Sequence, residues 1–172
     1  MDADFLLIRK MKQGDERAIE MFVRKYYPVI LQYCGYRCFD SDYAQDLAQE
    51  TFAKFFAALP QYRHQGKAKN YLYTIAGNLC RDQGRKKAEI PVEELIELPD
   101  DRTGQMDEKI QVEWALRQLP EEFREIIILY YFQELKGKEI AALLRIGLPL
   151  VKYRLRRAKE LLEKLLGEEE EA

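Results

Sequence analysis

The chain has 172 residues, of which 47% are hydrophobic and 34% charged, and its 28 basic and 30 acidic residues give a formal net charge of −2. That length suffices for one domain or two small ones, and the composition is typical of a globular protein, which excludes an intrinsically disordered chain. No apolar run approaches the roughly 18 residues of a membrane span, and acids precede the short apolar patch near the start, unlike a secretory signal peptide. We therefore expect no membrane insertion.

The cysteines and the single histidine disfavour a disulfide framework and a metal centre. Cys34, Cys38 and Cys80 are odd in number, no Cys-x-x-Cys pair occurs, and His64 is the only histidine. This usage is typical of proteins in a reducing compartment, so we expect a cytoplasmic location and no metal ligands. Cys34 and Cys38, one helical turn apart, fit either a redox pair or buried packing residues, and packing is the commoner case.

An amphipathic helix is predicted within residues 40–59, which read DSDYAQDLAQETFAKFFAAL. At about 100° per residue the apolar positions form one core stripe. These positions are Ala44, Leu47, Ala48, Thr51, Phe55 and Leu59. The other positions form a carboxylate and amide row with aromatics at one margin: Asp42, Asp46, Gln49 and Glu50, then Phe52 and Phe56. Such a row suits a protein interface with basic partner groups, although spacing alone favours both phenylalanines being packed under a neighbouring helix.

The stretch from Gln61 to Lys87 is strongly basic, and YLYTIAGNLCRDQGRKK at its end predicts a second amphipathic helix. Its core stripe is Leu72, Ile75, Ala76 and Leu79. The opposite side consists of Tyr71, Thr74, Asn78, Arg81 and Arg85, with Asp82 beside them, and Arg63 and Lys86 are further bases of the stretch. An aromatic ring, a hydroxyl, an amide and guanidiniums together offer stacking, hydrogen bonding and phosphate contact to nucleic acid. The helix alone supports equally well a solvated face with a half-buried tyrosine.

Residues 89–109 read as an acidic linker between two helical regions. Pro91 and Pro99 interrupt any helical period there, among a run of acidic residues, as is typical of a tether. A helical pattern resumes at about Ile110 and continues to Leu166, and strand patterns are scarce throughout. The predicted fold is therefore all-α, with small helical domains at 1–88 and 110–167, the linker at 89–109, and an acidic tail at 168–172 that we expect to fray.

The second domain contains a candidate helix-turn-helix. Its helices are predicted over Lys138–Leu144 and from Pro149 onward, because the missing N–H of a proline costs nothing at a first helical position. Between them, Gly147 tolerates a positive φ. On the second helix the inward positions are Val151, Leu155, Ala158 and Leu162, and the outward ones are Lys152, Tyr153, Arg156, Arg157, Lys159 and Glu160. Four cations around a tyrosine suit a DNA major groove; the alternative is an amphipathic helix merely exposed to solvent.

Several segments, in this order and spacing, resemble the extracytoplasmic-function (ECF) group of bacterial sigma factors in the sigma-70 family, the small two-domain initiation subunits of RNA polymerase. They are FVRKYYPVILQYC, DLAQETFAKFF, YLYTIAGNLCRDQGRKK, LPEEFREIIILYYFQELKGKEIAALL and VKYRLRRAKELL. The resemblance implies a first domain that binds the clamp helices of core RNA polymerase and melts the minus-ten element. It implies a second domain that binds the polymerase flap and reads the minus-thirty-five element as duplex, and an anti-sigma factor as a further partner.

The resemblance also implies roles for individual residues. Polymerase binding is expected at Asp46, Gln49 and Glu50, with Asp42, Phe52 and Phe56 beside them. Minus-ten binding is expected at Tyr71, Asn78, Asp82 and Arg85, together with Arg63, Thr74, Arg81 and Lys86. Minus-thirty-five binding is expected at Lys152, Arg154 and Arg157, together with Leu150, Tyr153 and Arg156.

Three departures from the family pattern bear on DNA recognition. Tyr71 stands where members often have tryptophan, which stacks more strongly. The turn reads Gly-Leu-Pro-Leu instead of the common Ser-x-Gly-Thr before the Val-Lys pair, so Leu150 offers no hydroxyl to a phosphate. Tyr153 stands where a small serine is usual.

Two other functional classes fit the sequence less well. Catalysis would call for paired carboxylates, a nucleophile–histidine arrangement, a phosphate-binding glycine loop or metal-ligand spacing, and the sequence offers none of these. We therefore expect no enzymatic activity and no cofactor. A helix-turn-helix regulator that binds duplex DNA without polymerase would account for the second domain, but it leaves the two polar faces of the first domain without a role.

Overall fold

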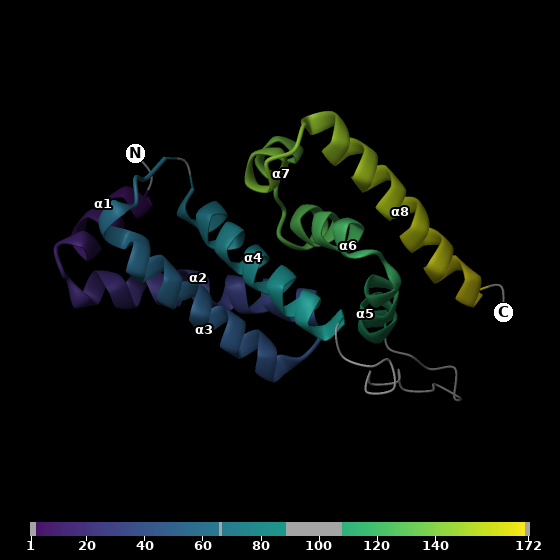
Figure 1. The fold of residues 1–172 in the computed structure, drawn as a ribbon, viewed down its shortest axis with the longest axis horizontal. Helices are drawn as coiled ribbons and strands as arrows, with labels where there is room; N and C mark the ends of the chain where they lie inside the picture. Colours follow the sequence, from purple (N-terminus) through teal and green to yellow (C-terminus); the bar gives the residue numbers. More distant parts are fainter. Residues whose placement is uncertain (1–2, 66, 89–107, 171–172) are drawn as a thin grey trace. The chain divides into compact units, whose positions relative to one another are not determined.

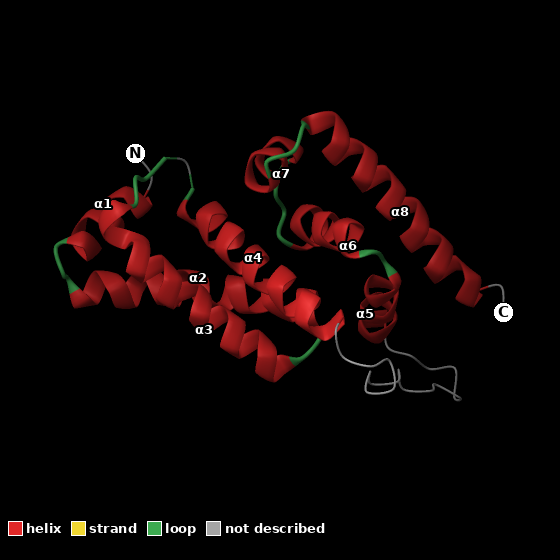
Figure 2. Ribbon diagram, viewed as in Figure 1, coloured by secondary structure: helices red, strands yellow, loops and turns green. Residues whose placement is uncertain are grey.

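A computed structural model describes residues 3–65, 67–88 and 108–170 of the chain (Figure 1). All regular structure in these ranges is helical (Figure 2). The chain divides into two compact units, Met1–Arg85 and Lys86–Ala172. The predicted all-α fold with two helical units is thus confirmed. Most of the expected linker, residues 89–107, lies outside the described residues, and no described helix is long and apolar enough to cross a membrane.

The first unit is built from four α-helices and one short 3-10 turn. They are α1 (Ala3–Lys12), α2 (Glu16–Cys38), α3 (Ser41–Ala58), η1 (Leu59–Gln61) and α4 (Ala68–Ala88). Two aspartates fix where helices begin, because a capping carboxylate satisfies amide groups that have no acceptor within the helix. Asp15 accepts hydrogen bonds from the backbone of Arg17 and Ala18 at the start of α2. Asp40 does the same at the start of α3, where Phe39 ends α2 with a left-handed φ of 58°.

Aromatic rings fill the core of the first unit. Phe22 of α2 and Phe55 of α3 are fully buried and stacked, with ring centroids 4.9 Å apart. Tyr33 of α2 meets Tyr73 of α4 edge-on at 5.2 Å, and both are fully buried. The stripe predicted on α3 is confirmed, since each of its members is buried. On α4 the predicted stripe is buried except for Ile75, which is half-buried.

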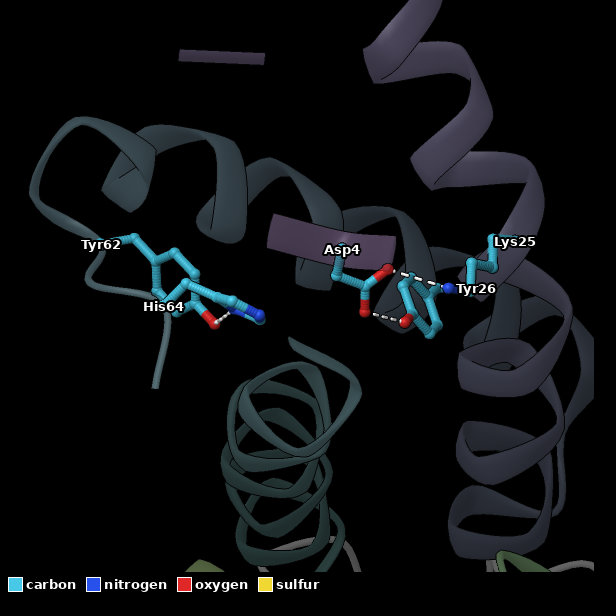
Figure 3. A network of polar contacts seen from close by, with 5 residues as sticks. All are labelled: Asp4, Lys25, Tyr26, Tyr62 and His64. Atoms are coloured by element: carbon cyan, nitrogen blue, oxygen red, sulfur yellow. Dashed lines mark hydrogen bonds and ion pairs between the residues drawn. The ribbon is translucent and has the colours of Figure 1, made fainter. Parts of the chain in front are cut away.

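Polar contacts hold α1 to this core, and a further contact lies within the loop after η1 (Figure 3). Asp4 of α1 is 6% exposed, and its carboxylate accepts from the Lys25 ammonium at 2.8 Å and from the Tyr26 hydroxyl. The Tyr62 hydroxyl lies 3.1 Å from Nδ1 of His64. A buried carboxylate is tolerated when it is paired and hydrogen-bonded, so the Asp4 network specifies how α1 packs on α2.

The cysteines are all free, and their surroundings support the packing interpretation. Cys34 is buried between α2 and α4, where a hydrogen bond with Cys80 and burial both raise the pKa of its thiol. Cys38 donates instead to the backbone oxygen of Asp40 at 3.3 Å. Because the thiolate is the reactive species, a raised pKa makes Cys34 inert.

The described residues of the second unit form five helical elements. They are α5 (Glu108–Gln118), α6 (Glu121–Ile127), the π-helical turn η3 (Ile128–Phe132), α7 (Gly137–Leu144) and α8 (Leu148–Glu170). The guanidinium of Arg124 in α6 donates to the backbone oxygens of Leu116, Arg117 and Leu119 at 2.9, 3.1 and 3.0 Å. This side chain therefore connects α6 to the carbonyl groups at the end of α5.

The turn between α7 and α8 differs from the prediction in detail. The left-handed residue is Arg145, with a φ of 57°, whereas Gly147, which tolerates a positive φ, does not adopt one. The chain reverses at Arg145, whose N–H donates to the backbone oxygen of Ala141. The backbone oxygen of Gly147 accepts hydrogen bonds of 3.1 Å from the N–H groups of Leu150 and Val151. Pro149 is the second residue of α8 rather than the first. It remains in the first turn, where amide groups have no acceptor within the helix.

Candidate protein and nucleic-acid interfaces

An acidic face lies on α3, opposite its buried stripe. We define it by the exposed residues Asp42, Asp46, Gln49 and Glu50. The face is rigidly presented, because Asp40 caps the helix and fully buried side chains anchor its other side. Tyr43 is 44% exposed and lies three residues before Asp46, so it shares this side of the helix. Tyr43 was not among the interface residues expected from the sequence, although its position outside the core stripe indicates that it is exposed.

Phe52 and Phe56 lie in or near the aromatic core, as their spacing favoured. Phe52 is only 5% exposed, and its ring lies 6.3 Å from Phe22 and 6.0 Å from Tyr27. Phe56 is half-buried and lies 5.7 Å from Phe55. Burying aromatic surface in the core stabilises the helix, so Phe52 supports the acidic face from beneath. The interface role expected for Phe52 is corrected accordingly.

The polar side of α4 begins at an aromatic cluster. Tyr71 is half-buried, with its ring 5.0 Å from Tyr62 and 5.9 Å from Phe55. These neighbours fix the orientation of the ring while part of it stays open to solvent. A ring held in one orientation loses little freedom when a base stacks on it, which favours binding. The expectation that Tyr71 is half-buried and the expectation that it faces a ligand are therefore compatible.

The rest of the α4 row is hydrogen-bonded along the helix. Thr74 donates to the backbone oxygen of Asn70 at 3.2 Å, and Arg81 donates to the side-chain oxygen of Asn78 at 3.1 Å. Asn78, Asp82 and the nearby Arg63 are exposed. The side chains of Arg85 and Lys86 lie outside the described residues. The described part of the row thus presents an aromatic ring, an amide and a guanidinium, as predicted.

The outward face of α8 is cationic with an apolar start. We define the α8 face by the exposed residues Leu150, Lys152, Tyr153, Arg156 and Arg157. The Arg156 guanidinium lies 5.7 Å from the centre of the Tyr153 ring, a cation–π contact. Arg157 forms an ion pair with Glu160 at 2.8 Å one turn further on. Between exposed partners such a pair is weak, so Arg157 can exchange Glu160 for a phosphate or a base.

Arg154 lies apart from the α8 face. Its guanidinium pairs with Glu122 of α6 at 3.7 Å, and its side chain is 23% exposed. The contact ties α8 to α6, which is a different role from the DNA contact expected from the sequence. Among the described residues there is no group of His, Cys, Asp and Glu side chains that could hold a metal ion.

Comparison with known proteins gives the same division of the chain. The family model Sigma-70 region 2 matches residues 22–90, and Sigma-70, region 4 matches residues 110–162. The chain is 31% identical to the ECF RNA polymerase sigma factor SigW of Bacillus subtilis, over 92% of this chain and 94% of that protein. It is 29% identical to the RNA polymerase sigma-H factor of Pseudomonas aeruginosa, over 96% of this chain and 94% of that protein.

Two solved structures share the fold. One is the sigma factor RpoE in complex with the anti-sigma factor NepR from Bartonella quintana, with a TM-score of 0.72, 23% identity, and coverage of 87% of this chain and 96% of that chain. The other is CnrH in complex with the cytosolic domain of CnrY, with a TM-score of 0.75, 22% identity, and coverage of 96% of this chain and 98% of that chain.

Proposed function

Because the chain belongs to the extracytoplasmic-function group of the sigma-70 family, we propose that its two helical units divide the steps of transcription initiation between them. The chain is an alternative sigma factor that directs initiation at specific promoters. Its family is regulatory rather than catalytic. The chain works in the cytoplasm, has no catalytic activity of its own, and acts only as a subunit of RNA polymerase.

The first predicted domain, residues 1–88, binds core RNA polymerase and opens the minus-ten element. The acidic face of α3 meets basic groups of the clamp helices, and the polar row of α4 meets the DNA strand as it separates. The second predicted domain, residues 110–167, binds the polymerase flap and places the α8 face on the minus-thirty-five element. An anti-sigma factor, such as the one bound to RpoE of Bartonella quintana, is expected as a further partner.

One observation supports this division above the others: the chain presents surfaces of opposite charge on separate units. The acidic face of α3 is fully exposed and carries three carboxylates, whereas the α8 face carries three cations. A carboxylate row repels DNA, so it calls for a protein partner with basic groups. A regulator that binds duplex DNA alone would have no use for that row.

A transcription assay tests the proposal. Core polymerase supplemented with this chain should initiate at discrete start sites on a library of genomic templates, and core polymerase without it should not. Sequencing the transcripts would then define the promoter. Failure of the chain to co-elute with core polymerase, combined with direct binding to duplex DNA, would contradict the proposal and favour the regulator.

We expect Tyr71→Ala to slow promoter melting while leaving closed-complex formation nearly intact. Stacking a base on an aromatic ring contributes roughly 1–3 kcal/mol, so the rate of opening should fall by about fivefold to 150-fold. Permanganate reactivity of unpaired thymines measures opening directly. Tyr71→Phe is the matched control, because it retains the ring that packs on Tyr62 and Phe55.

A template with a pre-melted bubble should rescue the Tyr71→Ala variant, because the unpairing step is then bypassed. Normal melting by this variant on a fully duplex promoter would show that Tyr71 has only a packing role.

A further inference from the structure

Two large apolar side chains interrupt the cations of the α8 face. Leu150 is 39% exposed and Tyr153 is 48% exposed. They lie three residues apart, so they are neighbours on the same side of the helix. Val151 and Ala158 pack α8 against the rest of the unit, and neither has exposed surface. The packing of α8 therefore does not require Leu150 or Tyr153.

The helix geometry places Tyr153 close to the centre of the exposed side. At about 100° per residue, Tyr153 and Arg156 lie on either side of the direction opposite to Val151 and Ala158. When that side enters a major groove, its central side chains point to the base edges, and the flanking ones reach the phosphates at the rim. Leu150 lies one turn nearer the start of α8, and the first residues of a recognition helix are the ones that contact base edges.

The Tyr153 ring is also held in place before it meets DNA. The Arg156 guanidinium lies 5.7 Å from its centre, so the cation–π contact restricts the ring. The face of a tyrosine ring held in one orientation is best matched by an apolar partner. Among the base edges of the major groove, the apolar group is the C5-methyl of thymine. Leu150 has no polar atom in its side chain, so an apolar partner is the one it can use.

We propose that Leu150 and Tyr153 form an apolar contact that selects thymine methyl groups in the upstream promoter element. The proposal rests on the proposed function in one respect, that α8 is the helix that reads this element. Lys152, Arg156 and Arg157 then supply affinity or contacts to other bases. The apolar pair adds a preference that neither charge nor hydrogen bonding can supply.

Deoxyuridine substitution tests the proposal, because it removes the methyl group and keeps every hydrogen-bonding edge of the base. Polymerase reconstituted with this chain is used to select a preferred upstream element from a randomised duplex. Each thymine of that element is then replaced singly by deoxyuridine, and binding is measured by fluorescence anisotropy. We expect at least one position where loss of the methyl weakens binding by about fourfold, the effect of burying one methyl-sized group.

Variants identify the side chains responsible. The double variant Leu150→Ser and Tyr153→Ser should bind thymine and deoxyuridine templates equally at that position. Tyr153→Phe should keep the preference, because the ring and not the hydroxyl makes the contact. Lys152→Ala should weaken binding to both templates alike. Circular dichroism verifies that α8 remains helical in each variant.

Failure of this proposal is distinguishable from failure of the proposed function. A selected element without thymine, equal binding of thymine and deoxyuridine at every position, or a preference that persists in the double serine variant would overturn the methyl contact alone. If instead no upstream sequence is selected and Lys152→Ala leaves binding unchanged, α8 is not the reading helix and both proposals fail.

Discussion

Reversing the charge of the acidic face, with Asp46→Lys and Glu50→Lys together, should abolish retention of the chain by core RNA polymerase. Both side chains are exposed on α3, opposite its buried stripe, so the change leaves the core intact. Removing a desolvated charge contact at an interface costs about 2–5 kcal/mol, and like charges add repulsion. Affinity should therefore fall by roughly 30-fold to several thousand-fold. Co-elution with core polymerase on a sizing column measures the loss.

A matched control separates this contact from a general effect of charge. Glu16→Lys with Glu20→Lys changes the net charge by the same amount at exposed sites on α2, away from the acidic face. That variant should bind core polymerase nearly as the parent chain does. Equal co-elution of the parent and the Asp46 and Glu50 double variant, with helicity preserved, would remove the acidic face from the interface.

Tyr43 refines the same interface. An exposed aromatic ring next to a charged row is a common centre of binding energy at protein interfaces. The helical period places Tyr43 outside the core stripe. Its neighbours in the sequence are small or polar. The two phenylalanines at the margin of the acidic face lie in or near the aromatic core. We therefore expect Tyr43 to make the hydrophobic contact with the partner.

Helical periodicity predicted what depends on position within one helix. The buried stripe of α3 and the exposed α8 face follow directly from spacing, because residues three and four apart share a side. Tyr73 and Cys80 were missed on α4, since its buried side is wider than one stripe. Tyr73 meets Tyr33, and Cys80 meets Cys34, both on α2.

Contacts between separate helices explain the remaining differences. Arg154 sits on the edge of α8, and only the approach of α6 turns it toward Glu122. The left-handed residue of the turn fell at Arg145 and not at Gly147, because the hydrogen bond to Ala141 closes the end of α7 at that point. A glycine nearby permits a positive φ but does not require it.

Phe55→Ala should cause the largest loss of stability in the first unit. Phe55 is fully buried, and its ring lies 4.9 Å from Phe22, 5.4 Å from Tyr62 and 5.9 Å from Tyr71. Removing a buried aromatic ring leaves a cavity and typically costs about 3–5 kcal/mol of unfolding free energy. Urea denaturation of the full chain, followed by far-ultraviolet circular dichroism, measures the change.

The single tryptophan provides an internal control for this variant. Trp114 belongs to α5 in the second unit, so its fluorescence follows that unit, and we expect its transition to stay where it is in the parent chain. Phe55→Leu restores most of the lost volume and should recover most of the stability. If the urea transition followed by Trp114 fluorescence shifted as much as that of the first unit, the prediction that the two cores unfold independently would be contradicted.

Phe55 also connects stability to promoter opening, because its ring supports both the acidic face of α3 and Tyr71 of α4. At a temperature where Phe55→Ala is still folded, polymerase binding should persist, since the exposed carboxylates remain on an intact helix. Melting should slow, because Tyr71 has lost one of the two rings that orient it. Adding Tyr71→Ala to Phe55→Ala should then slow melting by less than it does in the parent chain, the non-additivity expected of residues in contact. Full additivity of the two substitutions would mean that Tyr71 orients itself without Phe55.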